Sequence, residues 1–569
     1  MVAEVALEGV ATRPLTRTRA LVRAMLVALT FAAAMAFCLR DVLFSGFDLG
    51  FGDRADALIE ISILEHWRNV FHGIGDWRTP LYFHPYGDTL GYNDGYFLYG
   101  AVYSLLRLRF DPFVSDTLNA LIFKSIGFFS AFVLLRSTLG WRLGPALLAS
   151  VLFSIANSLA LQSVHAQLHS IGLLPLLALF VCRAWQAETS EREGRARLWA
   201  LAAAALTAVW LITSFYLAWF ALFFGGVFCL FWLRATGRWR AAPLLRLARE
   251  HGPTWAVAGG AFIVLCAPFL WVYLPKVWET GAHHFREAEN YLTMPLDPVN
   301  VGPDNLLWGW INRLLATFIP HKYVAEEHAS GYPLIQFVLF ATAARQVLKK
   351  PAAGLNSSAP LLRALALTIV ATWLVTIQLG PLSPWRLVFW FAPGATGLRT
   401  VVRYQLFLLL PVLILTFTAH RETWERLRFA RPAAAFGIVA LLLVENVNLQ
   451  SVAQLSRSAQ QAALAAIPAP PAACRSFVVV KARLAEAMYK KPTLDALYPH
   501  NVDAMLLAQL WRLPTINGFS TFNPPDWAFG GPTAPDYDAR VQAYAARHDL
   551  HGLCRLDMRQ ASPWSMARP

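Results

Sequence analysis

The sequence predicts a mainly α-helical, polytopic transmembrane bundle with a small α/β domain at its C-terminal end. Hydrophobic residues make up 56% of the 569 residues and charged residues only 15%, and the mean hydropathy is +0.44. Apolar stretches long enough to cross a bilayer as helices recur along the chain. A soluble globular chain of this length does not have so apolar a composition, so that class is excluded.

We count about eleven apolar stretches that are long enough to span a bilayer, straight or tilted. They lie at residues 21–40, 118–135, 144–161, 170–186, 198–213, 215–233, 255–274, 331–348, 361–380, 403–419 and 432–450. Two further apolar segments, Tyr96–Leu106 and Trp385–Phe391, are too short to span. We expect them to lie along the membrane interface or to re-enter the membrane.

Basic residues predict the orientation of the spans. Residues 1–20 and the start of the first span are rich in arginine, which places the N-terminus in the cytoplasm; these arginines are Arg13, Arg17, Arg19 and Arg23. Alternation then puts other basic connections inside, whereas the short outer turns near His165 and Ser214 carry no Lys or Arg. The net charge of +14, from 49 basic and 35 acidic residues, follows from this asymmetry and is no sign of nucleic-acid binding.

Alternation of the spans places three long segments on the outer, extracytoplasmic side. They are residues 41–117 and 275–330, which interrupt a membrane module at 21–450, and the C-terminal segment 451–569. In that segment an Ala/Pro-rich linker, Ala462–Ala473, leads into the apolar run Cys474–Val480. The run predicts a strand.

Helical patterning follows at 503–511 and 537–548, and a short strand-like piece lies near Cys554. These elements predict an α/β domain large enough for its own core. Cys474 and Cys554 are the only cysteines of this domain, near its first and last strands, and we expect a disulfide between them in an oxidising compartment. Two unpaired buried thiols are the alternative.

Acidic residues gather just after the first span. Asp53 and Asp56 are three residues apart, so one helical turn would present both carboxylates on one face. The segment 56–70 has the pattern of an amphipathic helix lying on the membrane. Either carboxylate could act as a general base at the membrane surface, with Asp56 preferred, or Asp53 could simply cap the helix. Asp94, later in the loop, is a candidate substrate ligand.

A His-Ala-Gln-Leu-His run lies between the third and fourth spans, on the same outer side as the first loop. His165 and His169 are four residues apart, so on an α-helix they would share a face, where they could grip a phosphate or a metal ion together with Gln167. The alternative is a polar helix end without a ligand.

Further cations on the outer side could bind a phosphate. Arg286 and Glu289 lie in the histidine-bearing part of the 275–330 loop, and Arg399 and Arg403 lie where the span 403–419 begins. A guanidinium offers paired donors that fit phosphate oxygens, although charged loops are usually only solvated. Lys124, within the second span, raises the same question, because a cation at membrane depth needs a partner.

Taken together, these features resemble the GT-C class of integral-membrane glycosyltransferases, in a bacterial branch whose members are uncharacterised. The resemblance covers nearly the whole chain and rests on short motifs. They are Gly52-Asp53-Arg54-Ala55-Asp56, Phe83-His84-Pro85, Asn93-Asp94, His165-Ala166-Gln167-Leu168, the run Leu398-Arg399-Thr400-Val401-Val402-Arg403-Tyr404, and the run Ile516-Asn517-Gly518-Phe519-Ser520-Thr521-Phe522-Asn523-Pro524.

The resemblance implies a glycosyltransferase of the bacterial inner membrane that moves a sugar from a polyprenyl-phosphate carrier to an extracytoplasmic acceptor, a glycan, lipid or protein, with inversion. A first-loop Asp is then the base, and Arg286, Arg399 and Arg403 are candidates to stabilise the leaving phosphate. A divalent metal ion serves in some members of the class. The C-terminal domain is expected in the periplasm. Better-known members often have adjacent acids where this chain has Asp-Arg-Ala-Asp, so both Asp53 and Asp56 stay candidates.

Proteins of two other functional classes also have many membrane spans. A lipid-linked glycan flippase or transporter typically shows internal repeats and polar residues deep within its helices, and we find no clear repeat here. A surface-polysaccharide polymerase could use the same outer loops on a diphosphate-linked donor, and the sequence does not separate it from a glycosyltransferase.

Overall fold

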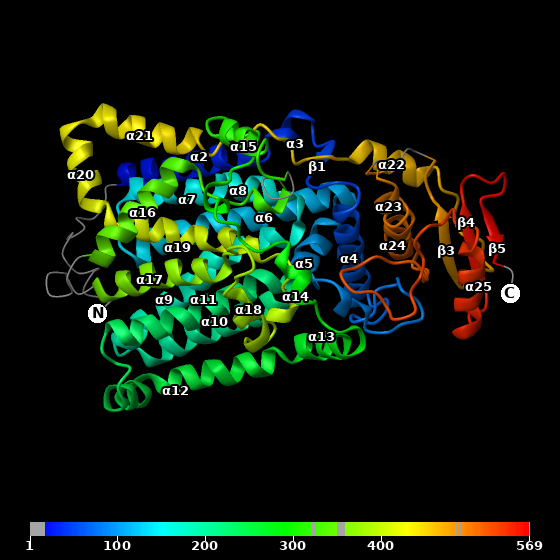
Figure 1. Cartoon of the computed structure of the whole chain (residues 1–569), viewed down its shortest axis with the longest axis horizontal. Helices are drawn as coiled ribbons and strands as arrows, with labels where there is room; N and C mark the ends of the chain where they lie inside the picture. Colours follow the sequence, from blue (N-terminus) through cyan, green and yellow to red (C-terminus); the bar gives the residue numbers. More distant parts are fainter. Residues whose placement is uncertain (1–16, 321–325, 350–358, 485–487, 490, 568–569) are drawn as a thin grey trace.

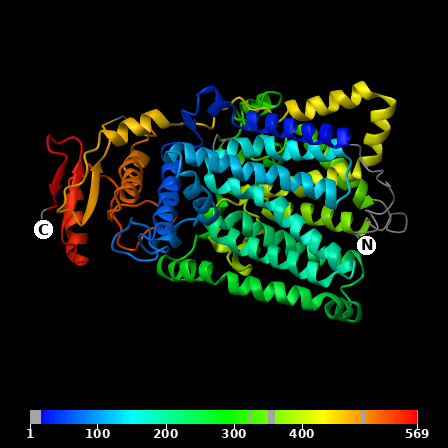
Figure 2. The ribbon, with the colours of Figure 1, turned by 180° about the vertical axis from the view of Figure 1, so that it is seen from behind.

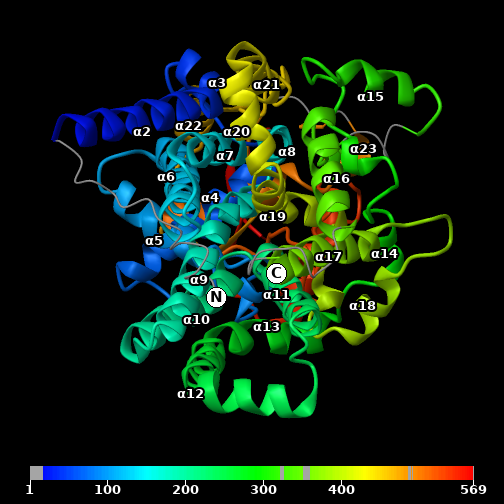
Figure 3. The same ribbon diagram turned by 90° about the vertical axis from the view of Figure 1, so that its left-hand side faces the viewer.

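The computed structural model describes residues 17–320, 326–349, 359–484, 488–489 and 491–567. Arg13 and most of the predicted segment 1–20 lie outside the described residues. Long helices run roughly parallel and form a bundle (Figure 1), and Figure 3 shows them along their axes. They are α2 (Arg17–Cys38), α6 (Pro112–Val133), α7 (Leu143–Ile155), α9 (Leu173–Thr189), α10 (Glu193–Thr213), α11 (Phe215–Ala235), α12 (Ala241–Leu265), α13 (Ala267–Thr280), α16 (Leu334–Lys349), α17 (Ala359–Thr376), α19 (Tyr404–Ala419) and α21 (Pro432–Val444).

All eleven predicted stretches form helices, but not all are long enough to span. Among the described residues, eight helices are long and apolar enough to cross a membrane, or nine if α12 and α13, bent by 51°, form one span. The stretches at 331–348 and 432–450 became α16 and α21, of only 16 and 13 residues. At about 1.5 Å per residue such helices are shorter than the bilayer core of about 30 Å.

Shorter elements connect the bundle helices. They are α3 (Arg40–Phe44), α4 (Asp56–Phe71), η1 (Thr89–Tyr92), α5 (Phe97–Leu106), α8 (Asn157–Leu161), η3 (Gln162–Val164), η4 (Ala166–Gly172), α14 (Phe285–Glu289), α15 (Gly309–Leu315), η7 (Glu326–His328), α18 (Trp385–Phe391), η10 (Val401–Arg403) and α20 (Arg421–Ala430). The two short apolar segments of the sequence are thus the helices α5 and α18. The end of the bundle that carries residues 41–111 and faces the C-terminal sheet is called the loop end (Figure 1).

The C-terminal segment forms a three-stranded sheet with helices beside it. Its elements are α22 (Arg457–Ala465), β3 (Ser476–Lys481), α23 (Pro492–Asp495), α24 (Pro499–Trp511), α25 (Tyr537–Arg547), β4 (Leu553–Asp557) and β5 (Trp564–Met566). Strand β3 is parallel to β4, with Phe477 opposite Cys554, and β5 is antiparallel to β4. A disulfide joins Cys474 to Cys554 across the sheet, as the sequence predicted. The predicted α/β domain is therefore present.

Part of the predicted Ala/Pro linker is helical. Helix α22 covers the start of the linker, because Ser456 caps it through the N–H of Ala459 and its Ala and Gln residues favour a helix. The preceding β2 (Leu455–Ser456) pairs antiparallel with β1 (Leu49–Gly50) of the first loop.

The first loop and the C-terminal segment are interlocked. The N–H of Thr515 donates to the carbonyl of Leu81 at 2.8 Å, and the N–H of Phe83 donates to the carbonyl of Asn517 at 3.0 Å. Helix α4 lies across the loop end between the bundle and α24, as Figure 2 shows from behind. We expected it on the membrane surface, but it is buried on both sides, since its apolar residues are spread around the helix rather than on one stripe.

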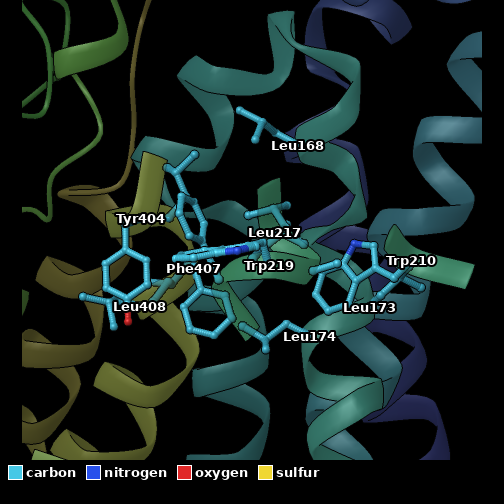
Figure 4. Close-up of a cluster of buried hydrophobic side chains, with 14 of the residues drawn as sticks. Leu168, Leu173, Leu174, Trp210, Leu217, Trp219, Tyr404, Phe407 and Leu408 are labelled. Carbon is cyan, nitrogen blue, oxygen red and sulfur yellow. The ribbon is translucent and has the colours of Figure 1, made fainter. Parts of the chain in front are cut away.

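Aromatic and leucine side chains fill the centre of the bundle (Figure 4). The rings of Tyr404 and Phe407, one turn apart on α19, stack with centroids 5.6 Å apart, and Phe220 of α11 packs against Tyr404 at 5.0 Å. Tyr404 directly follows η10 in sequence, so this rigid packing holds Arg403 in a defined position at the loop end.

Candidate active site

The two carboxylates at the start of α4 have different surroundings. One oxygen of Asp53, Oδ1, accepts the backbone N–H groups of Ala55 at 2.8 Å and of Asp56 at 3.0 Å. Asp53 therefore caps the helix. Asp56 is the first helical residue, and its side chain is 48% exposed. The helix N-terminus favours a negative charge there, and solvent or a substrate can reach it.

His165 connects Asp56 to a second carboxylate. Its Nδ1 lies 3.2 Å from Oδ2 of Asp56, and its Nε2 lies 3.2 Å from Oε1 of Glu327. Burial and the nearby Arg403 act to lower the pKa of His165, but Glu327 and Asp56 outweigh them, and the pKa is raised above its usual value. The imidazole therefore favours the protonated form between two acids.

Glu327 forms a two-bond ion pair with Arg403. Nε of Arg403 donates to Oε2 of Glu327 at 2.9 Å, and Nη2 donates to Oε1 at 2.5 Å. Both side chains are nearly buried, at 6% exposed for Arg403 and 12% for Glu327. Burial acts to raise the pKa of Glu327, but Arg403 and His165 hold it well below the usual range. Glu327 is therefore a carboxylate.

Glu327 was not among the residues singled out in the sequence. It precedes His328, whose Nδ1 lies 2.7 Å from Oδ2 of Asp297 at a buried position. This contact anchors η7 and with it Glu327. The run Glu326-Glu327-His328 just before the apolar stretch 331–348 was the available signal, since it places acids at the outer end of a predicted span.

Arg399 presents an exposed cation beside this network. Its guanidinium lies over the ring of Tyr291, 5.5 Å from the centroid. Its backbone N–H donates to Oη of Tyr216 at 2.8 Å. Within the described ranges no carboxylate forms an ion pair with Arg399, whereas Arg403 is engaged by Glu327. We call Asp56, His165, Glu327, Arg399 and Arg403 the Asp56 cluster.

Aromatic residues of the C-terminal segment lie over the Asp56 cluster. Burial, and then Asp56, raise the pKa of Tyr498 to about 12, while Arg399 acts to lower it. Tyr498 thus lies close enough to Asp56 and Arg399 for both of their charges to change its pKa. Its ring also packs on Phe519 with centroids 4.1 Å apart and on Tyr489 at 5.4 Å. Tyrosine faces of this kind suit the apolar face of a sugar ring.

Two of the predicted ligands hold loops in place. Oδ1 of Asp94 accepts the first N–H of α11, from Phe215, at 2.8 Å. Burial raises the pKa of Asp94 to about 6, although this hydrogen bond and Arg403 act against it. The side-chain oxygen of Gln167 accepts the hydroxyl of Tyr96 at 3.2 Å. Both residues therefore tie the first loop to the bundle next to the Asp56 cluster.

His169 does not join His165. His165 lies in extended conformation just before the 3₁₀ helix η4, and His169 lies within that helix, so the two do not share one α-helical face. The ring of His169 instead packs against Phe51, with centroids 5.5 Å apart, on the other side of the segment. The expectation that the two histidines share one face is therefore wrong.

Arg286 and Glu289 are not joined to the Asp56 cluster by an ion pair among the described residues. Glu289 lies 3.8 Å from Arg386 of α18. The side chain of Arg286 is exposed, and within the described part of the chain it forms no hydrogen bond or ion pair with the cluster.

The described residues do not offer a ready site for a divalent metal ion. They contain no group of three His, Cys, Asp or Glu side chains placed to hold one. Asp56 and Glu327 lie on opposite ring nitrogens of His165, and Glu327 already binds the guanidinium of Arg403.

Known proteins similar to this chain are found by structure and not by sequence. No family model matches it, and no curated protein matches it at a significant level. The oligosaccharyltransferase of Archaeoglobus fulgidus in its apo form aligns with 94% of this chain and 69% of its own length, at 10% identity and a TM-score of 0.49. ArnT from Cupriavidus metallidurans bound to undecaprenyl phosphate aligns with 88% of this chain and 86% of its own, at 14% identity and a TM-score of 0.36.

Proposed function

We propose that this protein is an integral-membrane glycosyltransferase of the GT-C type, which transfers a sugar from a polyprenyl-phosphate carrier to an acceptor hydroxyl or amine. The observation that carries the proposal is that an exposed carboxylate, Asp56, and an exposed guanidinium, Arg399, both lie near Tyr498 at the loop end of a membrane bundle. A base and an anion-binding cation are the two charges that a transfer from a lipid phosphate needs.

The proposed reaction is a single displacement. Asp56 accepts the proton of the acceptor, the acceptor oxygen or nitrogen forms a bond to the anomeric carbon, and the bond from that carbon to the phosphate oxygen breaks. The lipid phosphate leaves with the electron pair, and Arg399 stabilises its added negative charge. Attack opposite to the leaving group inverts the anomeric configuration.

The remaining members of the Asp56 cluster are positioning residues. His165 orients Asp56 through the 3.2 Å contact, and Glu327 with Arg403 fixes His165 from the other side. Tyr498 and Tyr489 supply aromatic faces for a sugar ring. The same charges would also serve a donor with a diphosphate link, so the polymerase reaction stays the second candidate.

The proposed location is the bacterial inner membrane, with a cytoplasmic N-terminus and with the loop end and the C-terminal domain in the periplasm. The basis is the arginine-rich start of α2, which lies at the end of the bundle opposite the C-terminal sheet (Figure 1).

Purified full-length protein supplied with a panel of radiolabelled polyprenyl-phosphate sugars and a membrane extract as acceptor source tests the function. We expect one sugar to be transferred and free polyprenyl phosphate to accumulate in equal amount. The Asp56→Asn variant should show neither, whereas Asp76→Asn, which changes another loop carboxylate that is bound to Arg78, should transfer normally. Transfer at the wild-type rate by Asp56→Asn would contradict the proposal.

A further inference from the structure

An apolar groove on the membrane-facing side of the bundle runs between α2, α7 and α21. It has a volume of about 570 Å³ and opens to the outside of the bundle. Its walls are almost entirely apolar and include Ala33, Phe37, Val151, Ile155 and Leu443. Three neighbouring helices leave room there for one hydrocarbon chain, next to the C-terminal ends of α7 and α21.

The groove leads to two small polar cavities. Phe37 and Ile155 line both the groove and the first cavity, which also holds Arg40 and Lys124. A second cavity, with His169 in its wall, shares Lys124 with the first. Each has about 20 Å³, enough for a water-sized group. The side chain of Lys124 forms part of the wall of both cavities.

Lys124 forms no ion pair with an acid among the described residues. Its Nζ lies over the ring of Phe51 at 5.5 Å from the centroid. Arg40 is partly engaged: it donates to the carbonyl oxygens of Asn448 at 2.7 Å and Gln450 at 3.5 Å, and its Nε lies 3.7 Å from Asp41. The lining therefore has two cations and one carboxylate. A cation at membrane depth is expensive to bury and calls for an anion.

We propose that the groove and these cavities bind a lipid that carries a phosphate on a single apolar chain, separate from the Asp56 cluster. The apolar chain of the lipid lies in the groove of α2, α7 and α21. Its phosphate lies against Lys124, with Arg40 at the side of the first cavity. Charge complementarity at the head and the apolar walls along the tail select this occupant. The proposed site also includes His169, which lines the second cavity and takes no part in the Asp56 cluster.

Binding of undecaprenyl phosphate to the purified full-length protein tests this site. The Arg399→Ala variant is the background, so that donor binding at the Asp56 cluster is weakened. In that background, Lys124→Met should reduce the affinity about tenfold or more, because it removes the charge and keeps the side-chain volume. Lys349→Met, on α16, is the matched control and should change nothing.

A matched pair of variants tests the groove that would hold the lipid chain. Ala33→Phe fills the groove and should reduce the affinity, whereas Ala32→Phe, on the exposed side of the same helix and outside the groove, should not. Undecaprenol and inorganic phosphate serve as competitors, and neither alone should displace the lipid phosphate at equal concentration.

The inference concerns binding only and does not depend on the proposed function. Equal affinity of Lys124→Met and its parent would overturn it, as would full displacement by inorganic phosphate, which points to a free-anion site. Displacement by undecaprenol or by two-chain phosphatidic acid at equal concentration would overturn it too. Thermal unfolding of each variant, unchanged from its parent, shows that a lost affinity is not a loss of fold.

Discussion

Asp53 accepts the backbone N–H of Asp56 at 3.0 Å, so the first of the two acids holds the second in place. The carboxylate of Asp53 accepts hydrogen bonds from backbone N–H groups at the start of α4, whereas that of Asp56 faces His165 and the solvent. The spacing of the two residues in the sequence left both as candidate bases, and the hydrogen bonds now favour Asp56.

The two acids should therefore respond differently to amidation. Asp56→Asn removes the base and is expected to lower transfer by about 10²–10⁴-fold. Asp53→Asn keeps an oxygen that can cap the helix, so its loss should be much smaller. Initial rates of sugar transfer at saturating donor measure both. Equal rates for the two variants would contradict the assignment of Asp56.

Arg399 should control donor affinity. Removal of an exposed guanidinium that binds a phosphate costs about 1.5–3 kcal/mol, or about 10–100-fold in affinity. We expect that loss for Arg399→Ala, and no loss for Arg345→Ala on α16, where the arginine is also exposed. Titration with a fluorescent polyprenyl-phosphate sugar gives both affinities. The same affinity in the two variants would rule out a donor contact.

The buried ion pair of Arg403 and Glu327 should contribute strongly to the free energy of unfolding. Arg403→Ala removes the two-bond partner of the buried Glu327 carboxylate and leaves it only the contact with His165, which destabilises by about 3–5 kcal/mol. The double variant Arg403→Met with Glu327→Gln removes both charges and should be clearly more stable than Arg403→Ala. Thermal unfolding in detergent compares them. If the double variant is no more stable than the single one, the cost does not come from the uncompensated charge.

His165 should make stability depend on pH. Its folded-state pKa is raised above the unfolded value of about 6.5, so its contribution is fully present below that pH and is lost as pH rises through the folded pKa. The difference in Tm between wild type and His165→Gln should then be largest near about pH 6 and shrink under alkaline conditions. A difference that grows with pH would mean that the neutral imidazole is the stabilising form.

The positions of the helices were predictable because membrane spans are determined by local composition. Each of the eleven apolar stretches became a helix, since a backbone in a bilayer must satisfy its own hydrogen bonds. Strand β3, helices α24 and α25, and the disulfide of Cys474 with Cys554 followed in the same way from periodicity and cysteine placement.

Contacts between distant segments were decided only by the tertiary structure. His165 lies 109 positions from Asp56, and Arg403 lies 76 positions from Glu327. No local pattern encodes such pairings, because they depend on how the helices pack. The 3₁₀ geometry of η4 turned His169 away from His165, and the packing of α4 against α24 buried a helix that its sequence placed on a membrane surface. Local residue patterns thus determined the elements and their chemistry, while packing decided which charged groups meet.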